Sequence, residues 1–199
     1  MRRPLVALAC ALGLALTAAG PAQAAETVQA SGSFRFSTGN GILPTWSTED
    51  IVLIGVSPGS VVTTATGTTA RVSLPIVAKT GTANAAAGGF RISNTTTGAS
   101  VRCSTPTIDT RARVVDCVLN DGTNADLLVI TDITSRSRVS GSSTVTTIFR
   151  GVELRINGQA MADMLNKELD TYAFSPSVTI GTGDLVVTRD RRAVVARRR

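Results

Sequence analysis

The segment Ala99–Leu119 (ASVRCSTPTIDTRARVVDCVL) decides the fold class, because two strand-like runs flank its polar centre near Thr110. Both runs are rich in Val, Thr, Ser and Ile, which favour extended backbone. In a hairpin with that centre, Cys103 lies opposite Cys117, and a cross-strand disulfide is geometrically reasonable. The segment therefore predicts two antiparallel strands joined by a disulfide bond.

The same β pattern recurs along the chain, in short apolar or alternating runs separated by Gly, Asn, Asp and Pro. Because proline cannot donate to a strand ladder, Pro75 predicts that its strand lies at a sheet edge. Gly151 predicts a bulge or bend. Further strands are expected over residues 28–36, 51–56, 72–76, 90–92, 126–133, 144–156 and 178–188. In the first of them Phe34 and Phe36 share one parity and Arg35 has the other, which predicts a half-buried strand.

One late segment, Asn157–Asp170, has a helical pattern instead. Its apolar residues recur at spacings of three and four, which places them on one helix face, and Asn157 can cap the helix start. Many short strands, one short late α-helix and one disulfide predict an antiparallel β-sandwich of the immunoglobulin-like kind. The apolar residues of the helix are Met161, Met164, Leu165 and Leu169.

Residues 1–24 have the pattern of a signal peptide. Arg2 and Arg3 precede the apolar run Leu5–Ala18, and Ala22-Gln23-Ala24 supplies the small residues of a cleavage site. The apolar run is shorter than the roughly 20 residues of a transmembrane helix. The sequence therefore predicts a protein that is not transmembrane and is secreted, extracellular or cell-wall associated. In that oxidising compartment, Cys103 and Cys117 are expected to pair.

The positive charge lies mostly in residues 189–199, which carry a net charge of +5. The expected β-sandwich domain, residues 25–188, has 12 basic and 13 acidic side chains, so it predicts no nucleic-acid-binding face. The tail is expected to be disordered. It either binds an acidic wall polymer or anionic lipid, or is simply solvated. Its arginines are Arg189, Arg191, Arg192, Arg197, Arg198 and Arg199.

The chain has no histidine, which excludes a Ser-His-Asp arrangement and leaves no catalytic residue or metal site to predict. Residues 120–126 are rich in oxygen ligands but lack calcium-loop spacing, so a hairpin turn is predicted there. Trp46 lies in a Gly- and Ser-rich segment, residues 37–50, that reads as a loop. It either anchors a ligand or partner or plugs one end of the sandwich.

The order of several segments resembles the haem-transport-associated (Htaa-type) domains of high-GC Gram-positive bacteria. That resemblance implies a secreted β-sandwich that binds a ligand, which is haem in the best-known members, through Tyr and His. Tyr172 is the only tyrosine here and is the candidate haem ligand that the resemblance implies. The segments that carry the resemblance are residues 72–77, 88–92, 106–109, 152–154, 160–166, Phe174 and 180–181.

Three functional hypotheses follow. The first is a secreted, non-enzymatic protein with a binding or structural role at the cell envelope, whose partner is an acidic cell-wall polymer or an envelope protein. The second is a soluble carrier of a small hydrophobic ligand such as haem. The third is an extracellular hydrolase that uses two carboxylates, which requires two acidic side chains to converge in a cleft. No resident cofactor is predicted.

Overall fold

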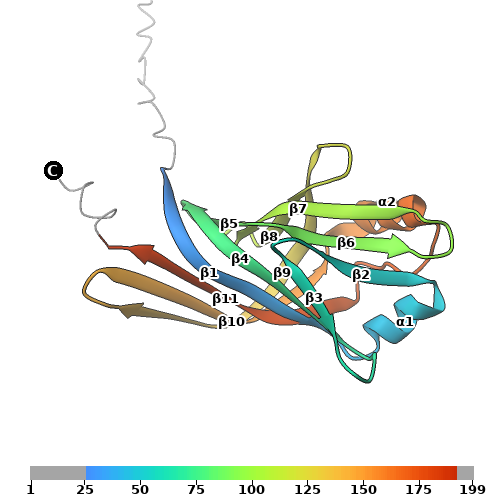
Figure 1. Ribbon diagram of the computed structural model, residues 1–199, viewed down its shortest axis with the longest axis horizontal. Coiled ribbons are helices and arrows are strands. Elements are labelled where there is room, and N and C mark those ends of the chain that lie inside the picture. The colour runs from blue at the N-terminus through green and yellow to red at the C-terminus, as the bar shows by residue number, and fades with distance from the viewer. Residues whose placement is uncertain (1–25, 192–199) are drawn as a thin grey trace, which may run out of the picture.

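The computed structural model describes residues 26–191, which form antiparallel strands with two helices (Figure 1). The predicted signal peptide lies outside this range. No helix within the range is long and apolar enough to span a membrane. The helices are α1 (Ile42–Thr48) and α2 (Gly158–Leu169). The strands are β1 (Thr27–Thr38), β2 (Ile51–Val56), β3 (Ser60–Thr63), β4 (Ala70–Thr80), β5 (Ala83–Ala86), β6 (Gly89–Asn94), β7 (Ser100–Asp109), β8 (Val114–Val118), β9 (Asn124–Ser140), β10 (Thr144–Ile156) and β11 (Thr179–Asp190).

Eight of these described strands close into a barrel. Around the ring the order is β1, β11, β10, β9, β8, β7, β5 and β4, and β4 pairs with β1 again. β3 attaches to β4, while β6 and β2 continue outward from β7. The predicted antiparallel, mainly β architecture is confirmed. The immunoglobulin-like sandwich is corrected to a closed barrel, because the β7–β8 pairing joins strands that would otherwise be sheet edges.

β4 is an inner strand, so the edge position predicted from Pro75 is wrong. β1 pairs along one side of β4, whereas β3 pairs with residues 70–73 and β5 with residues 76–80 on the other side. The Pro75 carbonyl accepts a hydrogen bond from the N–H of Ala87 at 2.9 Å, which places it on the β5 side. Backbone N and O of one residue point the same way in an antiparallel ladder. The missing N–H of Pro75 therefore falls in the gap between β3 and β5.

The alternation of apolar residues fills the interior of the barrel. On β1, Phe34 and Phe36 are buried while Arg35 is exposed, as the predicted half-buried strand requires. Leu74 on β4 and Leu185 on β11 lie opposite Phe34 and are fully buried. Because these side chains occupy the centre of the barrel, they leave little room there for a ligand.

Both helices lie at one end of the molecule (Figure 1). The predicted late helix is confirmed as α2, with Leu165 and Leu169 fully buried, although the Asn157 side chain makes no capping hydrogen bond. The segment predicted as a loop over residues 37–50 contains α1. This helix has only seven residues and holds Pro44 in its first turn, where a helix does not need the missing N–H. It is too short to show a helical period.

The predicted disulfide between Cys103 and Cys117 is confirmed, and it joins β7 to β8 with a Cα–Cα distance of 5.0 Å. The hairpin has a different centre from the predicted one, because its turn spans residues 110–113 and Thr107 lies opposite Asp116. A bulge with positive φ at Thr105 shifts the register and brings the two cysteines within bonding distance.

β11 continues past residue 188, where the tail was predicted to begin. Arg189 lies in β11 between Ala30 and Val145, so it belongs to the barrel wall and not to a free tail. Arg191 follows the strand, and its N–H donates to the carbonyl of Ser143 at 2.7 Å. The other predicted tail residues, Arg192, Arg197, Arg198 and Arg199, lie outside the described residues.

Candidate functional site

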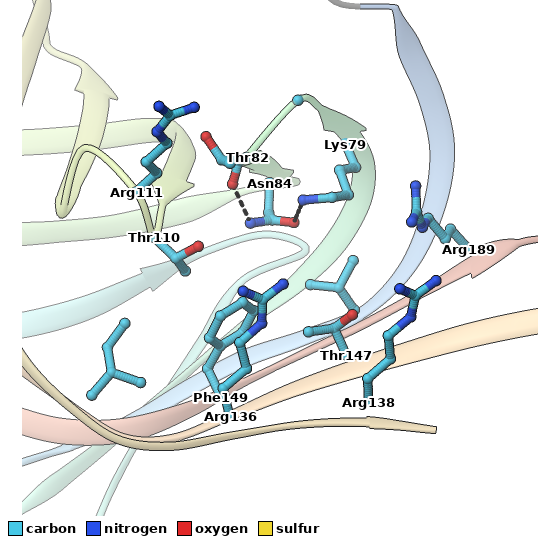
Figure 2. A pocket seen from close by; sticks show the side chains of 13 residues that line it. Lys79, Thr82, Asn84, Thr110, Arg111, Arg136, Arg138, Thr147, Phe149 and Arg189 are labelled. Carbon is cyan, nitrogen blue, oxygen red and sulfur yellow. Dashed lines mark hydrogen bonds between the residues drawn. The ribbon is translucent and has the colours of Figure 1, made fainter. Parts of the chain in front are cut away.

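A cavity of about 580 Å³ opens at the barrel end opposite the two helices, and we call it the mouth site (Figure 2). β9 continues to Ser140, well beyond its last pairing with β8 at Val129. The β9–β10 hairpin and β11 therefore form one wall of the cavity. The β4–β5 turn and the β7–β8 turn form the other wall.

Five cationic side chains surround the mouth site, and none of the described residues that line it is acidic. The guanidinium groups of Arg111, Arg138 and Arg189 have no hydrogen-bond or ion-pair partner within residues 26–191. Their N–H donors are therefore available to an anionic ligand. The five cations are Lys79 on β4, Arg111 in the β7–β8 turn, Arg136 and Arg138 on β9, and Arg189 on β11.

The floor of the mouth site is apolar. Phe149 on β10, Val187 on β11 and Ile133 on β9 supply it. The strand register places Arg136 opposite Phe149, and the guanidinium carbon lies 5.2 Å from the ring centroid (Figure 2). This cation–π contact holds a positive charge directly over the apolar floor.

Asn84 organises the turn that faces this floor. Its side chain is fully buried, and its amide group donates to the carbonyls of Thr82 and Ile108, both at 3.0 Å. Its amide oxygen accepts a hydrogen bond from the Lys79 ammonium group at 3.2 Å (Figure 2). Asn84 therefore joins β5 to β7 and fixes the position of the lysine charge in the cavity.

Asp109 links the two turns. Its carboxylate accepts hydrogen bonds from the Thr82 hydroxyl at 3.1 Å and from the N–H groups of Arg111 and Ala112 at 2.8 and 3.0 Å. Partial burial alone would raise the pKa of Asp109. These hydrogen bonds and the nearby Lys79 charge outweigh that effect and hold its pKa below the usual value. The carboxylate thus stays ionised and serves the turn structure.

The pKa of Lys79 is lowered from its ordinary value of 10.5. Burial of the ammonium group is the largest cause, and the charges of Arg189 and Arg136 act in the same direction against the opposing charge of Asp109. The mouth site thus holds more positive charge than the nearby Asp109 neutralises. An anion placed there would relieve this repulsion.

A pH dependence of anion binding follows from Lys79. We expect affinity to fall as the pH rises through the lowered pKa of this residue, because only the charged ammonium group attracts the anion. Lys79→Arg should remove this fall, since a guanidinium stays charged throughout the range. Titration calorimetry of both proteins at increasing pH measures the effect. The same fall in the Lys79→Arg protein would show that another group is responsible.

The structure places the two predicted binding residues away from the mouth site. Trp46 is 3% exposed and packs on Phe174, with ring centroids 5.2 Å apart, at the helix end of the barrel. This burial matches the plug interpretation. Tyr172 is 93% exposed, just after α2. Of the two predicted tail residues within the described range, Arg189 lines the mouth site and Arg191 does not.

Sequence reasoning missed Lys79, Arg111, Arg136 and Arg138. None of them belongs to a dense run of charge like the one at the C-terminus, so each is typical of a solvated surface. The available signal was the alternation of Arg136 and Arg138 within an extended run, which places both on one face of a strand.

Two carboxylates are cross-strand neighbours, although the hydrolase hypothesis requires two that converge in a cleft. Asp116 on β8 lies opposite Asp126 on β9. Burial raises the pKa of Asp116, and the charge of Asp126 adds to the rise. Neither residue lines the mouth site. The pair therefore lies apart from the mouth site.

No family model and no curated protein matches the sequence. Among solved structures, the chain is similar to the haem-binding protein HtaB from Corynebacterium glutamicum, with 11% sequence identity and a TM-score of 0.45. That alignment covers 83% of this chain and 98% of the other. The function is therefore inferred from the residues of the mouth site.

Proposed function

We propose that this protein is an exported, non-enzymatic binding protein whose mouth site holds a small ligand with an acidic group and an apolar body. The observation that supports this most is the combination of five cations with an apolar floor in one cavity that has no acidic lining residue among those described. The acidic group would accept charge-assisted hydrogen bonds from guanidinium groups. The apolar body would cover Phe149 and Val187.

Binding is favoured over catalysis because the two groups near the cavity that could act as a general base already serve the protein structure. Asp109 accepts three hydrogen bonds from the two turns, and Lys79 donates to Asn84. A general base needs a free carboxylate or amine within reach of the substrate. Export is part of the same proposal, since a disulfide bond persists in the compartment to which the leader sequence would direct the chain.

The mouth site is tested with a fatty acid and its uncharged alcohol as paired probes. We expect Arg138→Ala/Arg189→Ala to weaken fatty-acid binding by at least about tenfold, since each charge-assisted hydrogen bond contributes about 1.5–3 kcal/mol. The matched control is Arg91→Ala/Arg102→Ala, which removes the same charge from exposed cross-strand neighbours on β6 and β7. An equal loss in the control, or equal binding of acid and alcohol, would contradict the proposal.

Haemin is a third probe, because it joins two carboxylates to a flat apolar ring. If it binds in the mouth site, its absorption shift should survive Tyr172→Ala and weaken in Arg138→Ala/Arg189→Ala. The exposed Tyr172 is not among the residues that line the mouth site. If the absorption shift is lost in Tyr172→Ala but kept in Arg138→Ala/Arg189→Ala, then haemin binds beside α2 and is not a ligand of the mouth site.

A further inference from the structure

A second hollow, of about 400 Å³, lies on the outer wall of the barrel over β1, β4 and β11. We call it the wall groove. It shares no lining residue with the mouth site, because most of its side chains point outward from strands whose other face fills the core. The core residue Phe36 is the exception. On β1, for example, Arg35 and Ser37 line the groove while Phe34 is buried inside.

Two arginines flank the wall groove. Ser37 lies opposite Arg71 on β4, and Arg35 lies opposite Ser73, two residues further along the same pair of strands. Arg35 and Arg71 are therefore diagonal neighbours on one face, a position about 7–8 Å apart at the backbone. Long side chains in that relation can reach a single group between them.

Neither of these guanidinium groups has a hydrogen-bond or ion-pair partner within residues 26–191. The acidic group in the groove, Asp184, is already engaged. It forms an ion pair with Arg150 at 3.7 Å and accepts a hydrogen bond from the N–H of Gly151 at 3.1 Å. Arg35 lies opposite Asp184 on β11, and the two arginines outnumber this one carboxylate, so the lining of the groove keeps a net positive charge.

Several hydroxyl groups line the wall groove. Gly151 and Gly183 have no side chains to fill the groove, and the hydroxyl groups of Ser33, Ser37 and Thr182 line it beside them. A Cβ on Gly183 would overlap the carbonyl oxygen of Arg35, so only glycine permits this close approach of β11 to β1. Phe36 and Val186 add apolar surface beside these polar groups, so the groove can contact both the hydroxyls and the carbon backbone of a ligand.

We propose that the wall groove is a second binding site, for a hydroxyl-rich chain that carries phosphodiester groups. The two guanidinium groups would bind the non-bridging oxygens of one phosphate from two sides. The serine and threonine hydroxyls would exchange hydrogen bonds with the hydroxyls of the chain. This site is independent of the function proposed for the mouth site.

The test uses a glycerol-phosphate oligomer as the probe and neutral dextran as its uncharged counterpart, both measured by calorimetry. We expect the oligomer to bind, dextran not to bind, and affinity to fall as salt screens the charges. Arg35→Ala/Arg71→Ala should weaken binding by at least about tenfold. Arg91→Ala/Arg102→Ala, the same loss of charge on another exposed sheet face, should leave it unchanged.

Several outcomes would overturn the proposal that the wall groove binds this chain. One is an oligomer that does not bind the unmodified protein, and another is equal weakening in the two double variants, which indicates diffuse attraction. Oligomer binding that disappears in Arg138→Ala/Arg189→Ala but survives in Arg35→Ala/Arg71→Ala would assign the polymer to the mouth site. Conversely, fatty-acid binding that survives in Arg35→Ala/Arg71→Ala would show that the two sites succeed or fail separately.

Discussion

Replacing Cys103 and Cys117 together with alanine should lower the free energy of unfolding by about 3 kcal/mol, the value that the chain-entropy model gives for a loop of this size. The two residues are 14 apart in sequence and both are buried. Their bond joins β7 to β8, the pairing that closes the barrel. Removing this cross-link enlarges the ensemble of unfolded conformations, so the loss of stability should appear as a lower denaturant midpoint.

The control for this prediction is chemical reduction. The unmodified protein treated with a reductant should unfold near the midpoint of the double alanine variant, and the variant should not respond to the reductant. Circular dichroism during urea unfolding measures both. A variant that unfolds at the same urea concentration as the oxidised protein would show that the bond adds nothing to stability.

Strands with a strong local pattern were predictable from the sequence. The predicted limits of β2 and β10 agree with the structure, and the parity of Phe34 and Phe36 correctly assigned the buried face of β1. In each case a run of Val, Ile, Leu or Phe is long enough for its period to be read against the flanking turn residues. Local periodicity therefore identified most of the barrel wall.

Closure of the barrel was not predictable, because it depends on which strands pair. β5 links β4 to β7, yet it consists of Ala83–Ala86 (ANAA), which has no clear alternation. The bulge at Thr105 also arises only from the pairing register, as does the gap between β3 and β5 that accommodates Pro75. A sandwich of two sheets and a closed barrel can be built from the same alternating strands, so the sequence pattern alone does not distinguish the two folds.

The mouth site could not be predicted from the sequence for a related reason. Lys79 and Arg189 are over one hundred positions apart in the chain, and they meet because β1 lies between β4 and β11 in the ring. Charge counting directed attention to the dense terminal arginines instead. A charge that is unremarkable in sequence becomes part of a site only when the register assigns it to the inner face of the mouth.

Asn84→Leu should lower the free energy of unfolding by about 3 kcal/mol and weaken ligand binding at the mouth site. Leucine is close in size but leaves the carbonyls of Thr82 and Ile108 and the ammonium group of Lys79 without their partner. Each buried polar group that loses its hydrogen bond costs about 1–3 kcal/mol. Urea unfolding and fatty-acid titration of the same sample measure the two effects.

Asn124→Leu is the matched control, because Asn124 is an exposed asparagine in β9 and should tolerate the change. Asn84→Asp separates the two roles of the side chain. It keeps an oxygen for Lys79 but has no amide donors for the carbonyls of Thr82 and Ile108, so stability should fall while the lysine keeps a partner. If Asn84→Leu unfolds at the same urea concentration as Asn124→Leu, then other contacts hold the turn, and the strands alone give the mouth site its shape.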